Sequence, residues 1–283
     1  MPSIFEHLNN ATEILQSSGI EQSRREAASL LAFALEKDKT FLIVHPEYNL
    51  SNVEERRFRG FLKRRASREP FQYITGKQEF YGLDFLVTPD VLIPRPETEL
   101  IVETAIEILR GETRAQFCEV GVGSGCVSVS ILHEKKSASA IGFDISNKAL
   151  KVAQKNAETH QVIERLELKV SDVFEALRDE KFDLIVSNPP YISSEDTKKL
   201  QAEVRNFEPL MALTDGIDGF AIIEKIVTGA PTFLKDGGFL LLEIGFGQAS
   251  RVSQMFSPGI WSYIEILPDL QGIPRMMKAQ IGK

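Results

Sequence analysis

The sequence predicts an α/β protein with a doubly wound, seven-stranded Rossmann-like sheet, an antiparallel last strand and a small N-terminal helical bundle. Short apolar runs alternate with helical segments after residue 115, as in a sheet that is covered by helices on both faces. No clear helix separates the last two runs, so the final strand should be antiparallel. Before residue 76, apolar side chains recur at helical spacing instead.

The predicted helical bundle covers residues 1–75. Its apolar side chains recur three and four positions apart at Ile4, Leu8, Ala11, Ile14 and Leu15, and again at Ala27, Leu30, Leu31, Ala34 and Leu35. Ser51 and Glu54 have the spacing of a capping box and predict the start of a further helix, which Glu69-Pro70 should end. The bundle carries no catalytic motif of its own.

Residues 76–95 are predicted to form a β-hairpin linker. Gly82-Leu83-Asp84 suits the connector between its two strands, which contain Phe80, Tyr81, Phe85 and Val87. The next helix should begin at Pro96, because proline and acidic residues suit a first turn, and should stop at Gly111. Arg95 and Glu97 either form a local ion pair or line the entrance of a ligand site.

Residues 96–283 are predicted to form the α/β domain. Its strands are expected at 116–120, 139–143, 166–170, 182–186, 238–243 and 260–266, with a last strand near 275–280. Open sheets of this kind bind ligands at the carboxyl ends of their strands. Candidate site residues are therefore those that directly follow a predicted strand.

Composition excludes several classes of protein. The chain has 283 residues, of which 43% are hydrophobic and 26% charged, as in an ordinary globular protein. No apolar run approaches the ~20 residues that cross a membrane, and the first residues lack the features of a secretory signal. Cys118 and Cys126 give no disulfide framework, which predicts a reducing cytoplasmic location. Four scattered histidines have no metal-binding spacing, so we expect no metal.

The net charge of −7 argues against broad, nonspecific binding to DNA. The charge is uneven, however, because residues 51–69 contain Arg56, Arg57, Arg59, Lys63, Arg64, Arg65 and Arg68. Only Glu54, Glu55 and Glu69 oppose them in that segment. The basic segment is either a solvated helix face or a contact for nucleic acid or an acidic partner.

Asn188-Pro189-Pro190-Tyr191 is the most informative segment and follows the predicted strand 182–186. Its prolines lack a backbone N–H, so the turn presents acceptors: the Asn188 side-chain oxygen and nearby carbonyls, beside the ring of Tyr191. Such acceptors suit a planar NH2 group, whose lone pair is delocalised in an amide. Holding both hydrogens would favour a pyramidal, nucleophilic nitrogen in the transition state. Taken alone, the segment is also typical of a proline-rich turn.

A glycine-rich loop, Glu119-Val120-Gly121-Val122-Gly123-Ser124-Gly125, follows the first predicted strand of the sheet. Glycines let the backbone turn sharply and approach a ligand, although the spacing fits neither a dinucleotide fingerprint nor a P-loop. Asp144 ends the second strand, where a carboxylate can accept hydrogen bonds from two ribose hydroxyls, or can cap the next helix. Asp172 ends the third strand and can meet an adenine edge. Together these residues indicate a nucleoside site beside Asn188.

The combination resembles the class I S-adenosylmethionine-dependent amino-methyltransferases. Within that class, the chain resembles the protein-(glutamine-N5) methyltransferases of bacterial peptide-chain release factors. Three further segments and the helical N-terminal region carry the same resemblance, which covers nearly the whole chain. The segments are Leu92-Ile93-Pro94-Arg95-Pro96-Glu97-Thr98-Glu99, Phe207-Glu208-Pro209-Leu210-Met211-Ala212-Leu213 and Leu240-Leu241-Leu242-Glu243-Ile244-Gly245.

The resemblance implies methyl transfer from S-adenosyl-L-methionine to the side-chain amide of the glutamine in a release factor's Gly-Gly-Gln motif, which supports translation termination. The product of the cofactor would be S-adenosyl-L-homocysteine. The cofactor-binding residues would be Glu119, Gly121, Val122, Gly123, Ser124, Gly125, Asp144, Ile145, Asp172, Val173 and Asn188. The catalytic and substrate-binding residues would be Asn188, Pro189, Pro190 and Tyr191, with Arg95 also binding the substrate. We further expect a monomer that acts away from membranes, a helical domain that recognises the release factor, and a contact of helix 56–68 with the ribosome.

Two residues depart from the family pattern. Val122 stands where a threonine is common, and Val173 stands where relatives often carry an aromatic side chain that would stack more strongly on adenine. Two alternatives stay open. A DNA adenine-N6 or ribosomal RNA methyltransferase meets the same planar-NH2 problem but needs a surface for flipped or single-stranded bases. A non-catalytic docking module would not need Asn188 or Asp144.

Overall fold

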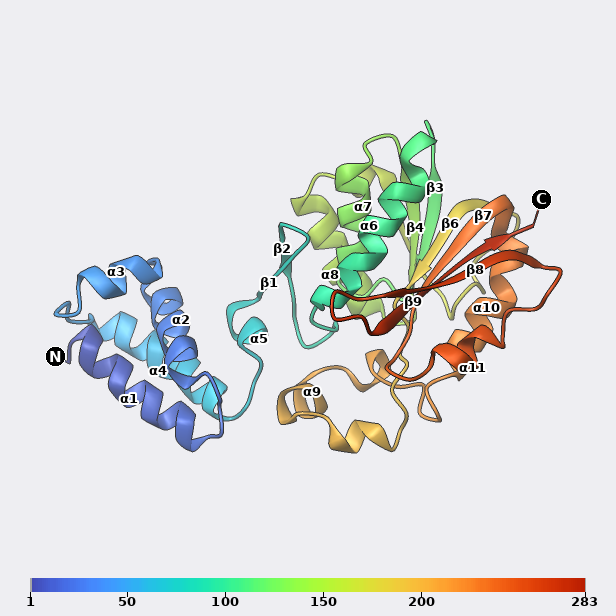
Figure 1. Ribbon diagram of the computed structural model, residues 1–283. Coiled ribbons are helices and arrows are strands. Elements are labelled where there is room, and N and C mark those ends of the chain that lie inside the picture. The colour runs from blue at the N-terminus through green and yellow to red at the C-terminus, as the bar shows by residue number, and fades with distance from the viewer. Residues whose placement is uncertain (1, 283) are drawn as a thin grey trace. The chain divides into compact units, whose positions relative to one another are not determined.

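The computed structural model describes residues 2–282 and divides into two compact units (Figure 1). The first unit ends at Gly76 and also includes Gln201–Phe207. The second unit consists of Lys77–Leu200 and the chain from Glu208 onward. A short segment from the middle of the sequence therefore belongs to the N-terminal unit.

The first unit is helical. Its helices are α1 (Ile4–Ser17), α2 (Ser23–Leu35), α3 (Lys39–Val44), α4 (Asn52–Ala66), α5 (Phe71–Thr75) and α9 (Ala202–Phe207). Ser51 and Glu54 form the expected capping box at the start of α4. The apolar positions that recur at helical spacing meet in one core, which includes Ile4, Leu15, Leu30 and Leu31.

Helix α4 ends earlier than the sequence predicts. Its last residue is Ala66 rather than a residue next to Pro70, because Arg68 takes a left-handed backbone conformation with φ of 71°. The N–H groups of Arg68 and Glu69 then donate to the carbonyls of Arg65 and Arg64, which caps the helix. The turn, and not the proline, stops the helix.

The second unit contains a seven-stranded sheet in the order β5-β4-β3-β6-β7-β9-β8. Its strands are β3 (Gln116–Val120), β4 (Ser139–Asp144), β5 (Leu166–Val170), β6 (Phe182–Ser187), β7 (Leu234–Glu243), β8 (Trp261–Pro268) and β9 (Pro274–Ile281). The last strand is antiparallel, as predicted, and lies between β7 and β8. The five strands β5, β4, β3, β6 and β7 pair in parallel with their neighbours in this order.

Helices cover both faces of this sheet (Figure 1). They are α6 (Glu99–Ile108), α7 (Cys126–Glu134) and α8 (Asn147–Thr159) on one face, and α10 (Ala221–Phe233) and α11 (Ala249–Ser253) on the other. Alternate strand residues serve the two layers: Phe117 and Leu184 pack with α6 and α7, whereas Cys118 and Ile185 pack with α10. The doubly wound fold is confirmed, and both cysteines are free.

Short elements connect these layers. A hairpin of β1 (Lys77–Phe80) and β2 (Leu83–Leu86) precedes the sheet. Its connector is Tyr81-Gly82, with φ of 51° and 71°, and not the predicted Gly82-Leu83-Asp84. The 3-10 helices are η1 (Pro96–Thr98), η2 (Leu109–Gly111), η3 (Ile163–Arg165), η4 (Asp196–Lys199) and η5 (Leu210–Ala212). In residues 2–282, no helix is both long and apolar enough to span a bilayer.

Candidate active site

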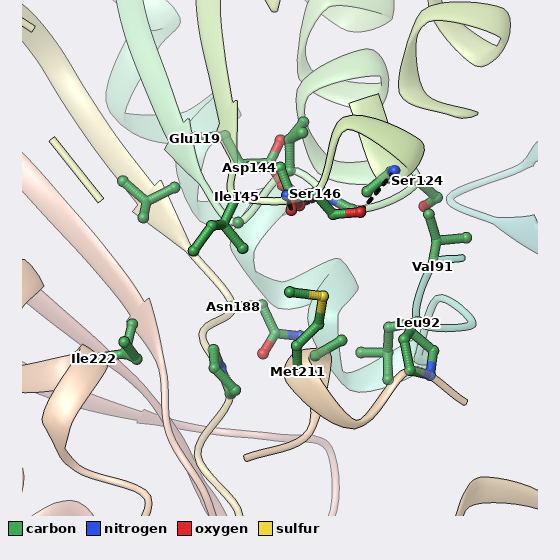
Figure 2. Close-up of a pocket in the computed structure, with 18 of the residues that line it drawn as sticks. Val91, Leu92, Glu119, Ser124, Asp144, Ile145, Ser146, Asn188, Met211 and Ile222 are labelled. Atoms are coloured by element: carbon green, nitrogen blue, oxygen red, sulfur yellow. Dashed lines mark hydrogen bonds between the residues drawn. The ribbon is translucent and has the colours of Figure 1, made fainter. Parts of the chain in front are cut away.

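A cavity of about 320 Å³ lies at the carboxyl ends of the central strands of the second unit (Figure 2). Its volume is at the lower end of the range of small-molecule sites. The order of the strands reverses between β3 and β6, and the cavity lies at this switch point. Its walls come from residues 90–92, 94, 95, 98, 119–124, 126, 127, 144–146, 149, 171–173, 188, 190, 209, 211, 212, 214, 215 and 222.

The glycine loop forms one end of the cavity. Gly121, Gly123 and Gly125 have φ of 77°, 53° and 81°, which side chains rarely adopt. The N–H groups of Gly121 and Val122 both donate to the Phe143 carbonyl at 2.8 Å, so the loop is tied to the end of β4. Gly125 lies outside the lining, because it packs against α8, where a Cβ would be 3.2 Å from that of Ala153.

Asp144 joins the glycine loop to the start of α8. Its carboxylate accepts hydrogen bonds from the N–H groups of Gly123 at 2.9 Å and Ser146 at 2.8 Å. Burial raises the pKa of Asp144, and these two N–H groups act in the opposite direction. Figure 2 shows Asp144, Ile145 and Ser146 together on one wall of the cavity. Asp144 is therefore a pre-oriented acceptor beside the loop.

Glu119 lies beneath the loop and also lines the cavity. The Ser128 hydroxyl and its backbone N–H both donate to Glu119, the latter at 2.9 Å. Burial raises the pKa of Glu119 to about 8. This carboxyl can therefore hold its proton near neutral pH.

Apolar side chains flank the polar end of the cavity. Ile145 is 59% exposed and reaches into the lining, as does Val173. The backbone of Val173 has φ of 51°, which is strained for a β-branched residue and is typical of ligand sites. Asp172 is paired with Lys225 at 2.8 Å. Val122 packs against Leu150 and Ala153, so its departure from the family pattern is accommodated within a packed cluster.

Asn188 forms the opposite wall of the cavity, near Met211 (Figure 2). Its Nδ2 donates to Thr98 Oγ1 at 3.0 Å, and the Thr98 hydroxyl donates to Glu243 Oε2 at 2.7 Å. The hydroxyl of Tyr191 donates to the other oxygen of Glu243 at 3.1 Å. Thr98 and Glu243 are buried, and burial raises the pKa of Glu243 to about 7.

The turn that carries Asn188 is tightly enclosed. Gln248 Nε2 donates to the Tyr191 carbonyl at 2.9 Å, and a Cβ on Gly219 would come within 2.2 Å of the same oxygen. Pro190 lines the cavity, whereas Pro189 and Tyr191 are not among the lining residues. Tyr191 instead anchors the turn, and burial beside Glu243 raises its pKa.

Of the two arrangements predicted for Arg95, the structure has the second: Arg95 lines the cavity, and its ion-pair partner is Glu208 rather than Glu97. Arg95 Nη2 lies 2.5 Å from Glu208 Oε1. Glu208 also accepts from the N–H of Ile93 at 3.2 Å, and its side chain is 1% exposed. Arg95 is thus held at the wall by a buried carboxylate from the segment that follows α9.

Sequence reasoning missed Thr98 and Glu243 as site residues. Both stand in segments that carry the family resemblance, but neither side chain shows a chemical pattern of its own. Their role becomes visible only where Asn188 and Tyr191 meet them across the sheet edge. In residues 2–282, no group of three or more His, Cys, Asp or Glu side chains is placed to hold a metal.

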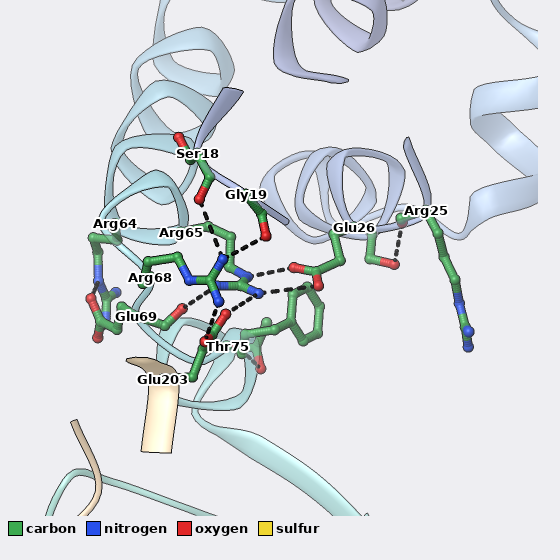
Figure 3. A network of polar contacts seen from close by, with 12 residues as sticks. Ser18, Gly19, Arg25, Glu26, Arg64, Arg65, Arg68, Glu69, Thr75 and Glu203 are labelled. Carbon is green, nitrogen blue, oxygen red and sulfur yellow. Dashed lines mark hydrogen bonds and ion pairs between the residues drawn. The ribbon is translucent and has the colours of Figure 1, made fainter. Parts of the chain in front are cut away.

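The basic segment belongs to the helical unit, where most of its basic side chains form ion pairs. Figure 3 shows Arg64, Arg65 and Arg68 among them. Arg65 is 6% exposed and pairs with Glu26 and Glu203, and Arg68 also pairs with Glu203 at 2.7 Å. The other pairs are Arg57–Glu36, Arg59–Glu55 and Arg64–Glu69. Much of the positive charge therefore holds α4 to α2 and α9.

Two family models match the chain. Residues 6–76 match the PrmC N-terminal domain, and residues 98–206 match the methyltransferase small domain. A crystal structure of a methyltransferase from Pyrococcus furiosus has the same fold, with a TM-score of 0.52 at 16% identity. The match covers 72% of this chain and 91% of that one.

Two curated relatives match over almost their full length. The release factor glutamine methyltransferase of Geobacter sulfurreducens is 44% identical over 268 residues, covering 95% of this chain and 93% of that protein. The release factor glutamine methyltransferase of Cereibacter sphaeroides is 40% identical over 274 residues, covering 97% of each. The conserved architecture and the identity over nearly the whole chain agree, and the chain belongs to the family of release factor glutamine methyltransferases.

Proposed function

We propose that this protein transfers a methyl group from S-adenosylmethionine to the side-chain amide nitrogen of the glutamine in a release factor's Gly-Gly-Gln motif. The observation that carries the proposal is the hydrogen bonding of the Asn188 amide. Its nitrogen is already engaged by Thr98, which leaves its oxygen to accept from a substrate NH2 group. The names of the relatives support the glutamine as the substrate.

The residues at the other end of the cavity fit the cofactor. The glycine loop allows a close approach of backbone to ligand, and the Asp144 carboxylate is pre-oriented to accept from ribose hydroxyls. Ile145 and Val173 offer apolar surface to the adenine, and Glu119 lies where it can meet the methionine part. When bound, the cofactor supplies an electrophilic methyl group on a sulfonium.

Asn188 is assigned the central role in the reaction. An amide nitrogen is a poor nucleophile because its lone pair is delocalised into the carbonyl. The Asn188 oxygen and the Pro189 carbonyl would accept its two hydrogens, which orients the lone pair and favours the pyramidal geometry of the transition state. The motif contains no basic side chain, so the surplus proton passes to water.

The helical unit is assigned to substrate recognition. It is the part of the chain that matches the PrmC N-terminal domain, and it contains no catalytic motif. The contact of helix 56–68 with the ribosome stays a prediction, and it relies on the exposed Arg56 and Lys63 more than on the paired arginines. A monomeric state and a cytoplasmic location also remain predictions.

Mass spectrometry of peptides after incubation with S-adenosylmethionine tests the proposal. Purified release factor, its Gly-Gly-Ala variant and unmethylated duplex DNA are offered side by side. We expect one added methyl on the Gly-Gly-Gln peptide and none on the variant. Methylated adenine together with unmodified release factor would overturn the proposal in favour of a DNA methyltransferase.

A further inference from the structure

Glu243 and Thr98 form a buried chain of hydrogen bonds that ends on Asn188. Hydrogen counting sets its direction. An ionised Glu243 can only accept, so the single hydroxyl hydrogen of Thr98 must point toward it. The Thr98 oxygen is then an acceptor, and Asn188 must turn its NH2 toward it. The Asn188 oxygen is thereby placed on the side away from Thr98.

The same carboxylate holds both ends of the Asn188-Pro189-Pro190-Tyr191 turn. One oxygen reaches Asn188 through Thr98, and the other accepts directly from Tyr191. Glu243 is 3% exposed and ends β7, a central strand, so it is a rigid support. It is not among the residues that line the cavity.

We propose that Glu243 and Thr98 are positioning residues that fix the Asn188 amide with its oxygen toward the methyl acceptor. The inference rests on the proposed function, because it explains how that site is oriented. Without an ionised Glu243, the Thr98 hydroxyl is free to donate to Asn188, and the amide can turn over. The turned amide would present an NH2 to the substrate NH2, which repels it.

Protonation of Glu243 should have the same effect as its removal. The groups that face it are Tyr191 from the turn, Arg275 from β9, Glu97 from η1 and Cys126 from α7. Arg275 favours the ionised form and Glu97 opposes it. Turnover should therefore fall as the pH drops through neutrality, and this loss should depend on Glu243.

Methylation kinetics of four variants test the positioning role. Thr98→Val keeps the shape but removes the hydroxyl, and we expect kcat to fall about 100-fold with unchanged binding of S-adenosylhomocysteine. Thr98→Ser should restore most of the turnover, and Glu243→Gln should lose turnover together with the acid limb of the pH profile. Thr104→Val is the matched control, since Thr104 of α6 is also buried but takes no part in this chain of hydrogen bonds. Normal kcat in Thr98→Val would overturn the inference.

A second readout does not depend on activity. The side-chain NH2 signals of Asn188, assigned by their loss in Asn188→Ala, report its hydrogen bond by NMR. In Thr98→Val we expect these protons to exchange faster with water than in the wild type and in Thr104→Val. Unchanged signals would contradict the inference even if the wild type methylated no release factor, and a wild type that methylates none would contradict the proposed function alone.

Discussion

The two ends of the cavity are held in place in different ways. The glycine loop and Asp144 are joined by backbone N–H groups within a short stretch of chain, as in the bond from Gly123 to Asp144, 21 residues apart. Asn188 and Tyr191 are held by side chains that lie 90 and 52 residues away. The first end depends on backbone conformation, whereas the second depends on two buried side chains, Thr98 at the cavity wall and Glu243 behind it.

This difference predicts which substitutions damage each end. At the glycine loop, an added Cβ should matter more than a polar change. At the Asn188 turn, removal of the Glu243 carboxyl should matter although Glu243 does not line the cavity.

Asn188→Ala should abolish methyl transfer, with a loss of at least about 1,000-fold in kcat, because the substrate NH2 loses its main acceptor. The affinity for S-adenosylhomocysteine, measured by calorimetry, should stay within a few-fold of the wild type. Near-normal turnover in this variant would contradict the assigned role of Asn188.

Gly219→Ala should displace the turn, because its Cβ would come within 2.2 Å of the Tyr191 carbonyl. Gly216→Ala is the matched control: φ is 80° rather than 82°, and nothing lies within 4 Å of the added Cβ. In the control variant, backbone strain alone should lower the free energy of unfolding by about 1 kcal/mol. In thermal unfolding, Gly219→Ala should melt at a much lower temperature than Gly216→Ala, and it should lose turnover. Equal melting temperatures and equal turnover in the two variants would disprove the close packing.

Asp144→Asn should act at the cofactor end. The amide retains one acceptor for the two N–H groups of Gly123 and Ser146 but loses the charge that favours ribose hydroxyls. We expect the affinity for S-adenosylhomocysteine to fall about 10-fold to 100-fold, with kcat at saturating cofactor much less affected. A fall in kcat without a change in affinity would place Asp144 at the substrate end instead.

The two buried glutamates should make stability depend on pH. The pKa values of Glu119 and Glu243 are raised to about 8 and about 7 by burial, against about 4.3 in an unfolded chain. Between those values the folded protein binds more protons, so the free energy of unfolding should fall as the pH rises. The fall should be complete only above pH 8.

Chemical denaturation between pH 5 and pH 9 measures this effect, with Glu119→Gln and Glu243→Gln compared with the wild type. Each variant should lose part of this pH dependence, up to about 4 kcal/mol over the range for Glu119→Gln and up to about 3 kcal/mol for Glu243→Gln. Curves that stay parallel to that of the wild type would show that neither carboxyl is protonated in the folded protein.

Much of the fold follows from local pattern. The strands expected at 116–120 and 166–170 have those bounds in the structure, and the last strand is antiparallel. The strand expected at 238–243 begins at Leu234, because pairing with β6 extends it past two glycines. The position of β9 between β7 and β8 was not predicted, since strand order depends on how whole layers pack.

The candidate site likewise contains residues that the sequence predicts and contacts that it does not. Gly121, Asp144 and Asn188 could be proposed from sequence, because each ends or directly follows a strand, and parallel strands end at one edge of the sheet. The ion-pair partners of charged side chains could not be predicted from the sequence. An ion pair of Arg95 with its neighbour Glu97 is one of the two arrangements that the sequence predicts, whereas folding brings Arg95 to Glu208, 113 residues away. For the segment that contains Arg65, the sequence predicts either a solvated helix face or a contact for nucleic acid or an acidic partner, whereas Arg65 is buried and pairs with Glu26 and Glu203.

Periodicity, capping residues and motif spacing are thus enough to identify the fold class, the glycine loop and the acceptor turn, because they are set by the dihedral angles of consecutive residues. The Glu243–Thr98–Asn188 chain is different, because its members lie up to 145 residues apart. Their meeting depends on the register of β7 beside β6 and on the position of η1, which brings Thr98 to both Glu243 and Asn188. Only packing of the folded chain determines which buried donor finds which buried acceptor.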